Sequence, residues 1–422
     1  MMEEHLGITV FATKSEGIKG VIKQRPEDFF VEEVSQYPPP SSGKHVIARV
    51  TARNWETHRL IEQIASLLHI PPEFIGYAGI KDKRAVTIQL MSFPVSMERV
   101  RNVHLADVTI DILYRSARPV YPGKLIGNRF AITIRDVEGD TDAVESIMKE
   151  VQELGFIPNF FGVQRFGIMR PITHVVGRHL LKNEMEKAVM TYIANPLEGE
   201  SEESYRPRKF LEETGDFSAA LPKYPEKLAF ERRVIQYLAA HPGEWKEALF
   251  QLPKNLIRMF LHAYQSYLFN RILSRRMTEG LSFFKAYEGD IIIPCDTGIE
   301  VQSREGIQVT PTNLRKINHQ IERHRCFPSG AIIGYDTVWA EGKMGIMEKK
   351  ILEEEDISEQ EFTMPHLPEF ACRGLRRITA IPLKTIRWNF EGKNLHLKFF
   401  LPKGCYATTV LREIMKAEVT HY

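Results

Sequence analysis

Apolar and polar positions alternate in several short segments of the first 180 residues, which is the period of a half-buried β-strand. Strands are predicted at 20–34, where a proline turn divides two of them, and at 45–50, 107–115 and 129–135. Residues Thr57–Leu68 instead carry one apolar stripe with helical spacing, formed by Leu60, Ile61, Ile64, Leu67 and Leu68. With a second helix expected over 141–154, this part of the chain is predicted to be α+β with mainly antiparallel strands.

The pattern changes in the middle of the chain and then returns to its first form. Helices are predicted at 227–241, 243–250 and 253–276, followed by a strand-rich stretch near 291–310, and Asn195–Arg208 is a polar segment typical of a loop. Strand patterns reappear at 378–383 and 395–401, before a final helix over 409–417. We therefore expect one domain formed by residues 1–185 and 370–422, interrupted by an inserted α+β domain over 186–369.

Composition mainly excludes some classes of protein and site. The chain has 422 residues, 43% hydrophobic and 26% charged, which is typical of a globular protein. It opens Met-Met-Glu-Glu-His, and no run approaches the roughly 18 apolar residues of a membrane span, so we expect a cytoplasmic protein. The four cysteines lack paired spacing, which predicts buried thiols and no metal site.

Charge is unevenly distributed, although the net charge is only +2. Residues 371–422 contain ten Lys or Arg and three Glu, a balance of +7, while residues 339–362 are acidic around Glu353–Asp356. A basic surface of this kind is suited to phosphates, which indicates that the chain can bind a polyanion.

Candidate chemistry begins with Asp82, which lies among Lys81, Lys83 and Arg84 between two apolar segments, 75–80 and 86–91. A nearby cation favours the ionised carboxylate by roughly 1–3 pKa units, so this Asp is suited to act as an anion. The pattern places it at the tip of a hairpin. Taken without context, a solvated charged turn explains the same residues.

A second motif is Asn159-Phe160-Phe161-Gly162-Val163-Gln164-Arg165-Phe166-Gly167. Glycines allow close approach of a ligand, and an aromatic beside an amide offers a stacking face and a hydrogen-bonding edge to an unstacked base. The alternative is a glycine turn whose aromatics belong to the core. Near the C-terminus, residues 399–413 read as a strand, a glycine turn and the start of a helix, which suits either a phosphate or an ordinary turn.

These segments together resemble the TruD family of pseudouridine synthases. The family pattern Ala-Gly-x-Lys-Asp-x-x-Ala-x-Thr-x-Gln is matched at 78–89. The resemblance extends to Lys23 with 26–29, to 159–167, to Gln265–Asn270, which we expect to be helical core, and to 401–413. It is weak over 186–225 and 310–365, and Cys405 stands where Ser or another small residue is expected.

The resemblance implies a pseudouridine-synthase-like catalytic domain with a mainly antiparallel sheet and flanking helices. It implies an isomerase that converts a uridine of transfer RNA, typically at position 13, to pseudouridine without a cofactor. Asp82 would be the catalytic residue, either attacking the substrate covalently or removing a sugar proton, and both routes stay open.

Roles for the other residues follow from the resemblance and from residue chemistry. Phe161 would stack on the extruded base, Asn159 would bind the uracil edge or hold the loop, and Lys23 would contact Asp82 or a phosphate. Lys81 and Arg84 would form the ion-pair and phosphate environment, and Arg165 would also bind substrate. The inserted domain would form the other wall of an RNA cleft, with backbone contacts from Arg206, Arg208, Lys209, Arg232, Arg233 and Lys254. Such a cleft needs only a monomer.

Two other functions are compatible with parts of the sequence. A non-catalytic RNA-binding or RNA-folding protein would keep the cleft, but an anion facing phosphates would weaken its binding. An N-glycoside hydrolase would pair Asp82 with a second acid, for which Asp28, Glu32 and Glu33 are the candidates.

Overall fold

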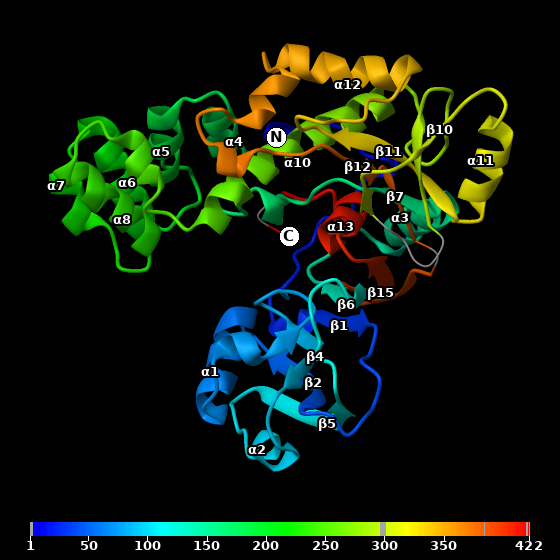
Figure 1. Cartoon of the computed structure of the whole chain (residues 1–422). Coiled ribbons are helices and arrows are strands. Elements are labelled where there is room, and N and C mark those ends of the chain that lie inside the picture. Colours follow the sequence, from blue (N-terminus) through cyan, green and yellow to red (C-terminus); the bar gives the residue numbers. More distant parts are fainter. Residues whose placement is uncertain (1–2, 296–300, 384, 419–420, 422) are drawn as a thin grey trace. The chain divides into compact units, whose positions relative to one another are not determined.

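The computed structural model describes residues 3–295, 301–383, 385–418 and 421, and the chain forms two compact units (Figure 1). Unit 1 contains the described residues up to Phe11, Pro158–Cys295 and Gln302–Ala380; unit 2 contains those of Ala12–Ile157 and Ile381–Tyr422, with Val301. The α+β class is confirmed. The chain passes between units at 157/158 and 380/381, whereas the domain limits expected from sequence, 185/186 and 369/370, both lie within unit 1.

Unit 2 is built on an eight-stranded sheet in the order β14-β15-β6-β1-β4-β2-β5, with β3 paired to β4. Its strands are β1 (Phe29–Ser35), β2 (His45–Arg53), β3 (Gly76–Tyr77), β4 (Val86–Phe93), β5 (Val108–Ser116), β6 (Leu125–Ile134), β14 (Arg387–Glu391) and β15 (Asn394–Pro402). Its helices are α1 (Thr57–Leu68), α2 (Met97–Arg101), α3 (Thr141–Leu154) and α13 (Ala407–Met415). At the passages between units, β7 (Phe156–Pro158) pairs with β13 (Ala380–Pro382).

The pairing of β1 with β4 is parallel, with Phe30 opposite Val86 and Glu32 opposite Ile88. The other strand pairs in the described part of this sheet are antiparallel. Strands that run in the same direction begin at the same edge of a sheet. The segments that precede β1 and β4 are therefore brought together, although about sixty residues separate them in the sequence.

Two apolar clusters cover this sheet. One lies under α3 and α13 and includes Phe29, Val31, Ile147 and Leu411, all fully or almost fully buried. The other lies between α1 and the strands β2 and β4, and Figure 1 shows α1 beside these strands. Helix α1 has the predicted bounds, but Leu67 is 47% exposed and the neighbouring Ala65 packs inward instead.

A buried ion pair connects β1 to the segment before β4. Lys81 Nζ lies 2.9 Å from Glu33 Oε2, and both side chains are less than 5% exposed. Ser35 donates a hydrogen bond of 2.6 Å to the second carboxylate oxygen, Glu33 Oε1. Because an unpaired charge is costly to bury, this contact holds the segment before β4 against β1.

Unit 1 consists of helices around a five-stranded antiparallel sheet in the order β10-β8-β11-β12-β9. The strands are β8 (Ile291–Pro294), β9 (Gln302–Ser303), β10 (Ile307–Gln308), β11 (Cys326–Ile332) and β12 (Leu375–Ile378). The helices are α4 (Thr173–Leu181), α5 (Met185–Ile193), α6 (Glu202–Thr214), α7 (Phe217–Ala220), α8 (Ala229–Ala240), α9 (Trp245–Leu249), α10 (Lys254–Thr278), α11 (Leu314–Glu322) and α12 (Gly342–Glu354).

Helix α10 is the centre of this unit and packs against α4, α12 and β11. Gln265, Leu268, Phe269 and Asn270 are buried on it, so the expectation that Gln265–Asn270 is helical core is confirmed. Among the described residues, no helix is both long enough and apolar enough to cross a membrane.

Three sequence predictions about local structure were wrong. The second half of Asn195–Arg208 is helical, since α6 begins at Glu202 and its Arg208 side chain is buried against Glu200 and Glu231. Residues before the proline turn form only a bridge from Val21 to Arg135. Of the four cysteines expected to be buried, Cys295 and Cys405 are partly exposed.

Substitution of one member of the buried ion pair is expected to destabilise unit 2. Lys81→Met leaves the Glu33 carboxylate without its cation, which lowers the free energy of unfolding by about 3–5 kcal/mol. Urea denaturation followed by circular dichroism measures this loss, and Lys81→Met/Glu33→Met restores most of it. As a control, Lys149→Met breaks the exposed pair with Glu153 and costs less than about 1 kcal/mol. A similar cost for both single substitutions would contradict the structural role of Lys81.

Candidate active site

The segment that carries Asp82 is an eight-residue connection, 78–85, between β3 and β4. It is wider than the hairpin tip that the pattern predicts, because strand β3 contains only Gly76 and Tyr77. The backbone N–H of Lys81 donates to Thr57 Oγ1 at 2.9 Å, and the carbonyl of Ala85 accepts from the N–H of Asn54 at 2.9 Å. The connection is thus fixed at several points along its length.

The Asp82 carboxylate contacts the ammonium group of Lys23, with 2.9 Å between Oδ1 and Nζ. The Asp82 side chain is 37% exposed and that of Lys23 is 13% exposed, so the anion faces solvent while its cation is largely covered. Lys23 Nζ also lies 4.2 Å from the centre of the Phe29 ring. A cation held on an aromatic face beside a carboxylate fixes the position of that carboxylate.

Lys23 adopts a left-handed backbone conformation, with φ +57°. Such a conformation costs a non-glycine residue roughly 1–2 kcal/mol, and strain of this kind is concentrated at functional sites. The unusual backbone lies in the segment that turns into β1 and presents its side chain to Asp82.

The three cations beside Asp82 in the sequence have different environments. Lys81 is buried and paired with Glu33, so it does not reach a phosphate as the sequence suggested. Arg84 is exposed and donates through Nη2 to the carbonyl of Gln24 at 3.0 Å, which ties the connection to the segment before β1. Lys83 is exposed.

The candidate second acids are engaged in ion pairs. Asp28 is 2% exposed and lies 2.6 Å from Arg135, while Glu32 lies 3.5 Å from Arg49 and 3.6 Å from Arg129. Burial acts to raise the pKa of Asp28, but hydrogen bonds from Arg135 and from the backbone of Arg25 outweigh it, and the pKa falls below its usual value. Asp28 is therefore held as an anion and is poorly suited to donate a proton.

Asn159 belongs to unit 1 and is completely buried. Its Nδ2 donates to the carbonyl of Ile378 at 2.9 Å, and its Oδ1 accepts from Arg377 Nη2 at 2.7 Å. Its backbone N–H donates to the carbonyl of Thr379 at 2.9 Å. These contacts attach the start of the 159–167 motif to the end of β12.

Phe161 is also in unit 1, and its side chain is 6% exposed. The guanidinium of Arg377 lies 4.0 Å from the ring centre, and Phe269 meets the ring edge-to-face at 5.7 Å. Asn270 binds both backbone groups of Phe161, accepting from its N–H at 2.8 Å and donating to its carbonyl at 3.1 Å. The ring is held rigidly from both its backbone and its side chain.

Arg165 is half-buried and donates through Nε to Ser266 Oγ at 3.2 Å. The motif ends at Gly167, whose φ is +97° and whose missing Cβ would lie 2.5 Å from the carbonyl of Arg170. Glycine is therefore required there for the turn itself. In sum, the structure brings Lys23, Lys81, Asp82 and Arg84 together in unit 2, and Asn159, Phe161 and Arg165 together in unit 1.

Three residues that shape these sites were not identified from the sequence as site residues. Glu33 was considered only as a possible second acid. It alternates with Phe29, Val31 and Ser35 on the buried face of β1, and a charge at such a position is expected to be paired. Arg377 was assigned to a basic surface, and Asn270 to the core without a role at Phe161. No pattern in a single sequence signals these two contacts.

The basic surface expected over 371–422 is smaller than the ten Lys and Arg residues of this segment suggest. Arg376, Arg377 and Arg412 are buried, and Lys384 lies outside the described residues. Arg376 pairs with Glu348 at 2.7 Å and Arg412 with Glu413 at 3.3 Å. Helix α13, which follows the glycine turn at Gly404, is buried along its length, so this block serves packing.

Comparison with known proteins identifies the family of this chain. The family model "tRNA pseudouridine synthase D (TruD)" matches residues 5–414. A probable tRNA pseudouridine synthase D from Methanococcoides burtonii is 40% identical over 99% of this chain and 98% of its own length. One from Pyrococcus furiosus is 39% identical over 98% of this chain and 100% of its own.

A solved structure shows that the resemblance extends to the fold. The crystal structure of the putative TruD from Methanosarcina mazei aligns with a TM-score of 0.86 at 36% identity, covering 99% of this chain and 98% of that one. The match over nearly the whole length shows that the chain belongs to the tRNA pseudouridine synthase D (TruD) family.

Proposed function

We propose that this chain converts a uridine of transfer RNA to pseudouridine, with the Asp82 carboxylate as the catalytic group. The observation that carries the proposal is the contrast between the carboxylates on β1 and on the segments that precede β1 and β4. Asp28 and Glu33 are buried in ion pairs, whereas Asp82 faces solvent and is held by the covered cation of Lys23. A group that acts on a large substrate needs this combination of exposure and fixed position.

The reaction breaks the N1–C1′ bond of uridine and forms a C5–C1′ bond, while the proton on C5 leaves and N1 gains a proton. No electrons are exchanged with another molecule. Asp82 acts either by attacking the substrate or by removing a sugar proton, and an ionised, positioned carboxylate serves both routes. Lys23 is a positioning residue, since it contacts the carboxylate directly.

We further propose that the target is position 13 of transfer RNA, that the chain is cytoplasmic and that it acts as a monomer. The base must leave the RNA stack to reach a carboxylate, and Phe161 is our candidate to stack on it. The contacts of Asn159 favour the second of its two roles, because its amide binds Ile378 and Arg377 and thereby holds the motif. Arg84 and Arg165 remain candidates for phosphate contacts.

Neither rival function is favoured by the site. A hydrolase needs a second acid that can donate a proton, but Asp28, Glu32 and Glu33 are all engaged by cations. A protein that only binds RNA gains nothing from a solvent-facing Asp82 among its contacts.

Asp82→Asn is expected to abolish catalysis while preserving shape. Pseudouridine formation on unmodified transfer RNA, without added cofactor, should fall by about 10²–10⁴-fold or more, with RNA binding retained. Asp111→Asn, at an exposed position of β5, should leave the activity unchanged. Activity surviving in Asp82→Asn would contradict the proposal; released uracil from the unsubstituted chain would favour the hydrolase, and bound but unmodified RNA the binder.

Lys23→Met is expected to slow the reaction because Asp82 loses a charge-assisted hydrogen bond. Such bonds are worth about 1.5–3 kcal/mol, which predicts a 10- to 150-fold lower single-turnover rate. The matched control, Lys83→Met, removes a charge from the same connection at an exposed position and should have little effect. Equal losses in the two variants would show that local charge matters and the Lys23–Asp82 contact does not.

Phe161→Leu tests the stacking role without emptying the core, whereas Phe161→Ala would also cost about 3–5 kcal/mol of stability at this buried site. Loss of a base stack predicts a 5- to 150-fold lower single-turnover rate. Phe269→Leu, which removes the edge-to-face partner ring, serves as the control for packing. Unchanged rates for Phe161→Leu, or equal losses for both variants, would refute the stacking role.

A further inference from the structure

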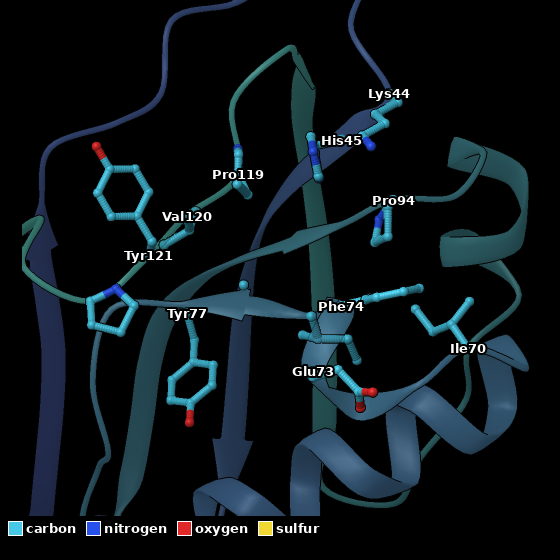
Figure 2. A pocket seen from close by; sticks show the side chains of 13 residues that line it. Lys44, His45, Ile70, Glu73, Phe74, Tyr77, Pro94, Pro119, Val120 and Tyr121 are labelled. Carbon is cyan, nitrogen blue, oxygen red and sulfur yellow. The ribbon is translucent and has the colours of Figure 1, made fainter.

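Unit 2 contains a cavity of about 670 Å³ that none of the proposed catalytic residues lines (Figure 2). Its walls come from the start of β2, the connection from α1 to β3, the residue after β4 and the connection from β5 to β6. A volume of this size is typical of a ligand site. The cavity lies where β4 ends at Phe93, and the Asp82 connection lies where β4 begins at Val86.

The walls of the cavity are aromatic and rigid. Phe74 and Tyr121 are 56% and 46% exposed, which is unusual for side chains of this size in one place. Tyr77 and three prolines, at positions 94, 119 and 122, complete the apolar lining. The backbone at Gly76 passes so close to the carbonyl of Val120 that a Cβ there would lie 2.1 Å from that oxygen, so the floor of the cavity requires glycine.

A buried polar atom lies among these walls without a partner. His45 lines the cavity and is 8% exposed, and within the described part of the chain no hydrogen-bonding group meets its Nδ1. Burial, and secondarily the charge of Lys44, lower the pKa of His45, so the ring is neutral and Nδ1 can donate or accept according to its tautomer. Nδ1 itself has almost no accessible surface, so a ligand in the cavity meets the His45 ring without a hydrogen bond to this atom.

The charges around the mouth favour an anionic ligand. Lys44 is exposed at the mouth, Arg118 precedes the lining residue Pro119, and Lys124 Nζ lies 5.6 Å from the centre of the Tyr121 ring. Glu73 is the acidic residue in the lining. Aromatic faces and surrounding cations are together the features that hold an unstacked nucleotide.

We propose that this cavity binds an unpaired nucleotide of the substrate RNA other than the uridine that reacts. Its base lies against Phe74 and Tyr121, its edge faces the His45 ring, and its phosphate faces Lys44. This inference rests on the proposed function, and it adds a second point of recognition within unit 2. Because Asp82 is five positions after Tyr77, their Cα atoms are at most about 18 Å apart, the length of about five stacked nucleotides.

Binding of unmodified transfer RNA to the full-length chain tests the proposal. Phe74→Ala/Tyr121→Ala should raise Kd about tenfold to a hundredfold, because each stacked base contributes strongly to affinity, and kcat/KM should fall by more than kcat. Both side chains are largely exposed, so the fold is retained. Leu113→Ala, which removes a side chain 38% exposed on the same sheet and outside the cavity, should not change Kd.

Cross-linking identifies the occupant. In transcripts with 4-thiouridine at single unpaired positions, one position other than the target should cross-link to the peptide containing Tyr121 or Tyr77.

Several results would overturn the proposal. Unchanged Kd in the double variant, or cross-links confined to the target uridine, would exclude a nucleotide and leave the cavity to a proline-rich or aromatic peptide. A failure of the proposed function gives a different result. In that case the unsubstituted chain forms no pseudouridine, whether or not the cavity binds RNA.

Discussion

The parallel pairing of β1 with β4 is the constraint on which the rest of the site depends. The other described pairs of this sheet are antiparallel. Because β1 and β4 run in the same direction, they begin at the same edge, and the segments that precede them lie together there. One segment supplies Lys23 and the other supplies Asp82, and their side chains meet at 2.9 Å. Without the pairing, two residues 59 positions apart would have no reason to be neighbours.

The two ion pairs formed by Lys81 and Asp82 of the connection before β4 have opposite environments and therefore different tasks. The Lys81–Glu33 pair is buried, so it fixes the connection but is closed to a substrate. The Lys23–Asp82 pair is open on the side of the carboxylate, where screening by solvent makes its contribution to stability small. The first pair provides rigidity, and the second provides a positioned anion.

Sequence patterns predicted much of the secondary structure, because the spacing of apolar residues within one helix or strand is a local feature. The α1 helix and the strands β2, β4, β5 and β6 follow from periodicity, whereas the first strand expected within 20–34 and the hairpin tip at Asp82 do not form as predicted. The positions of charged side chains were harder to predict. Composition alone suggests that arginines lie on the surface, but Arg208, Arg376 and Arg377 are buried and contact Glu231, Glu348 and Asn159 from other segments. Thr87 and Gln89 of β4 are likewise buried, because both faces of this central strand are covered. Long-range pairing, which a single sequence does not encode in any local pattern, determines all of these positions.

The most direct test of the central claim is a crystal structure of the Asp82→Asn variant bound to unmodified transfer RNA. The substitution preserves the shape of the side chain and should trap the substrate before turnover. We predict an extruded uridine whose glycosidic bond lies within contact distance of the side chain at position 82, with Lys23 still beside it. A uridine bound elsewhere, with another carboxylate at its glycosidic bond, would contradict the assignment of Asp82.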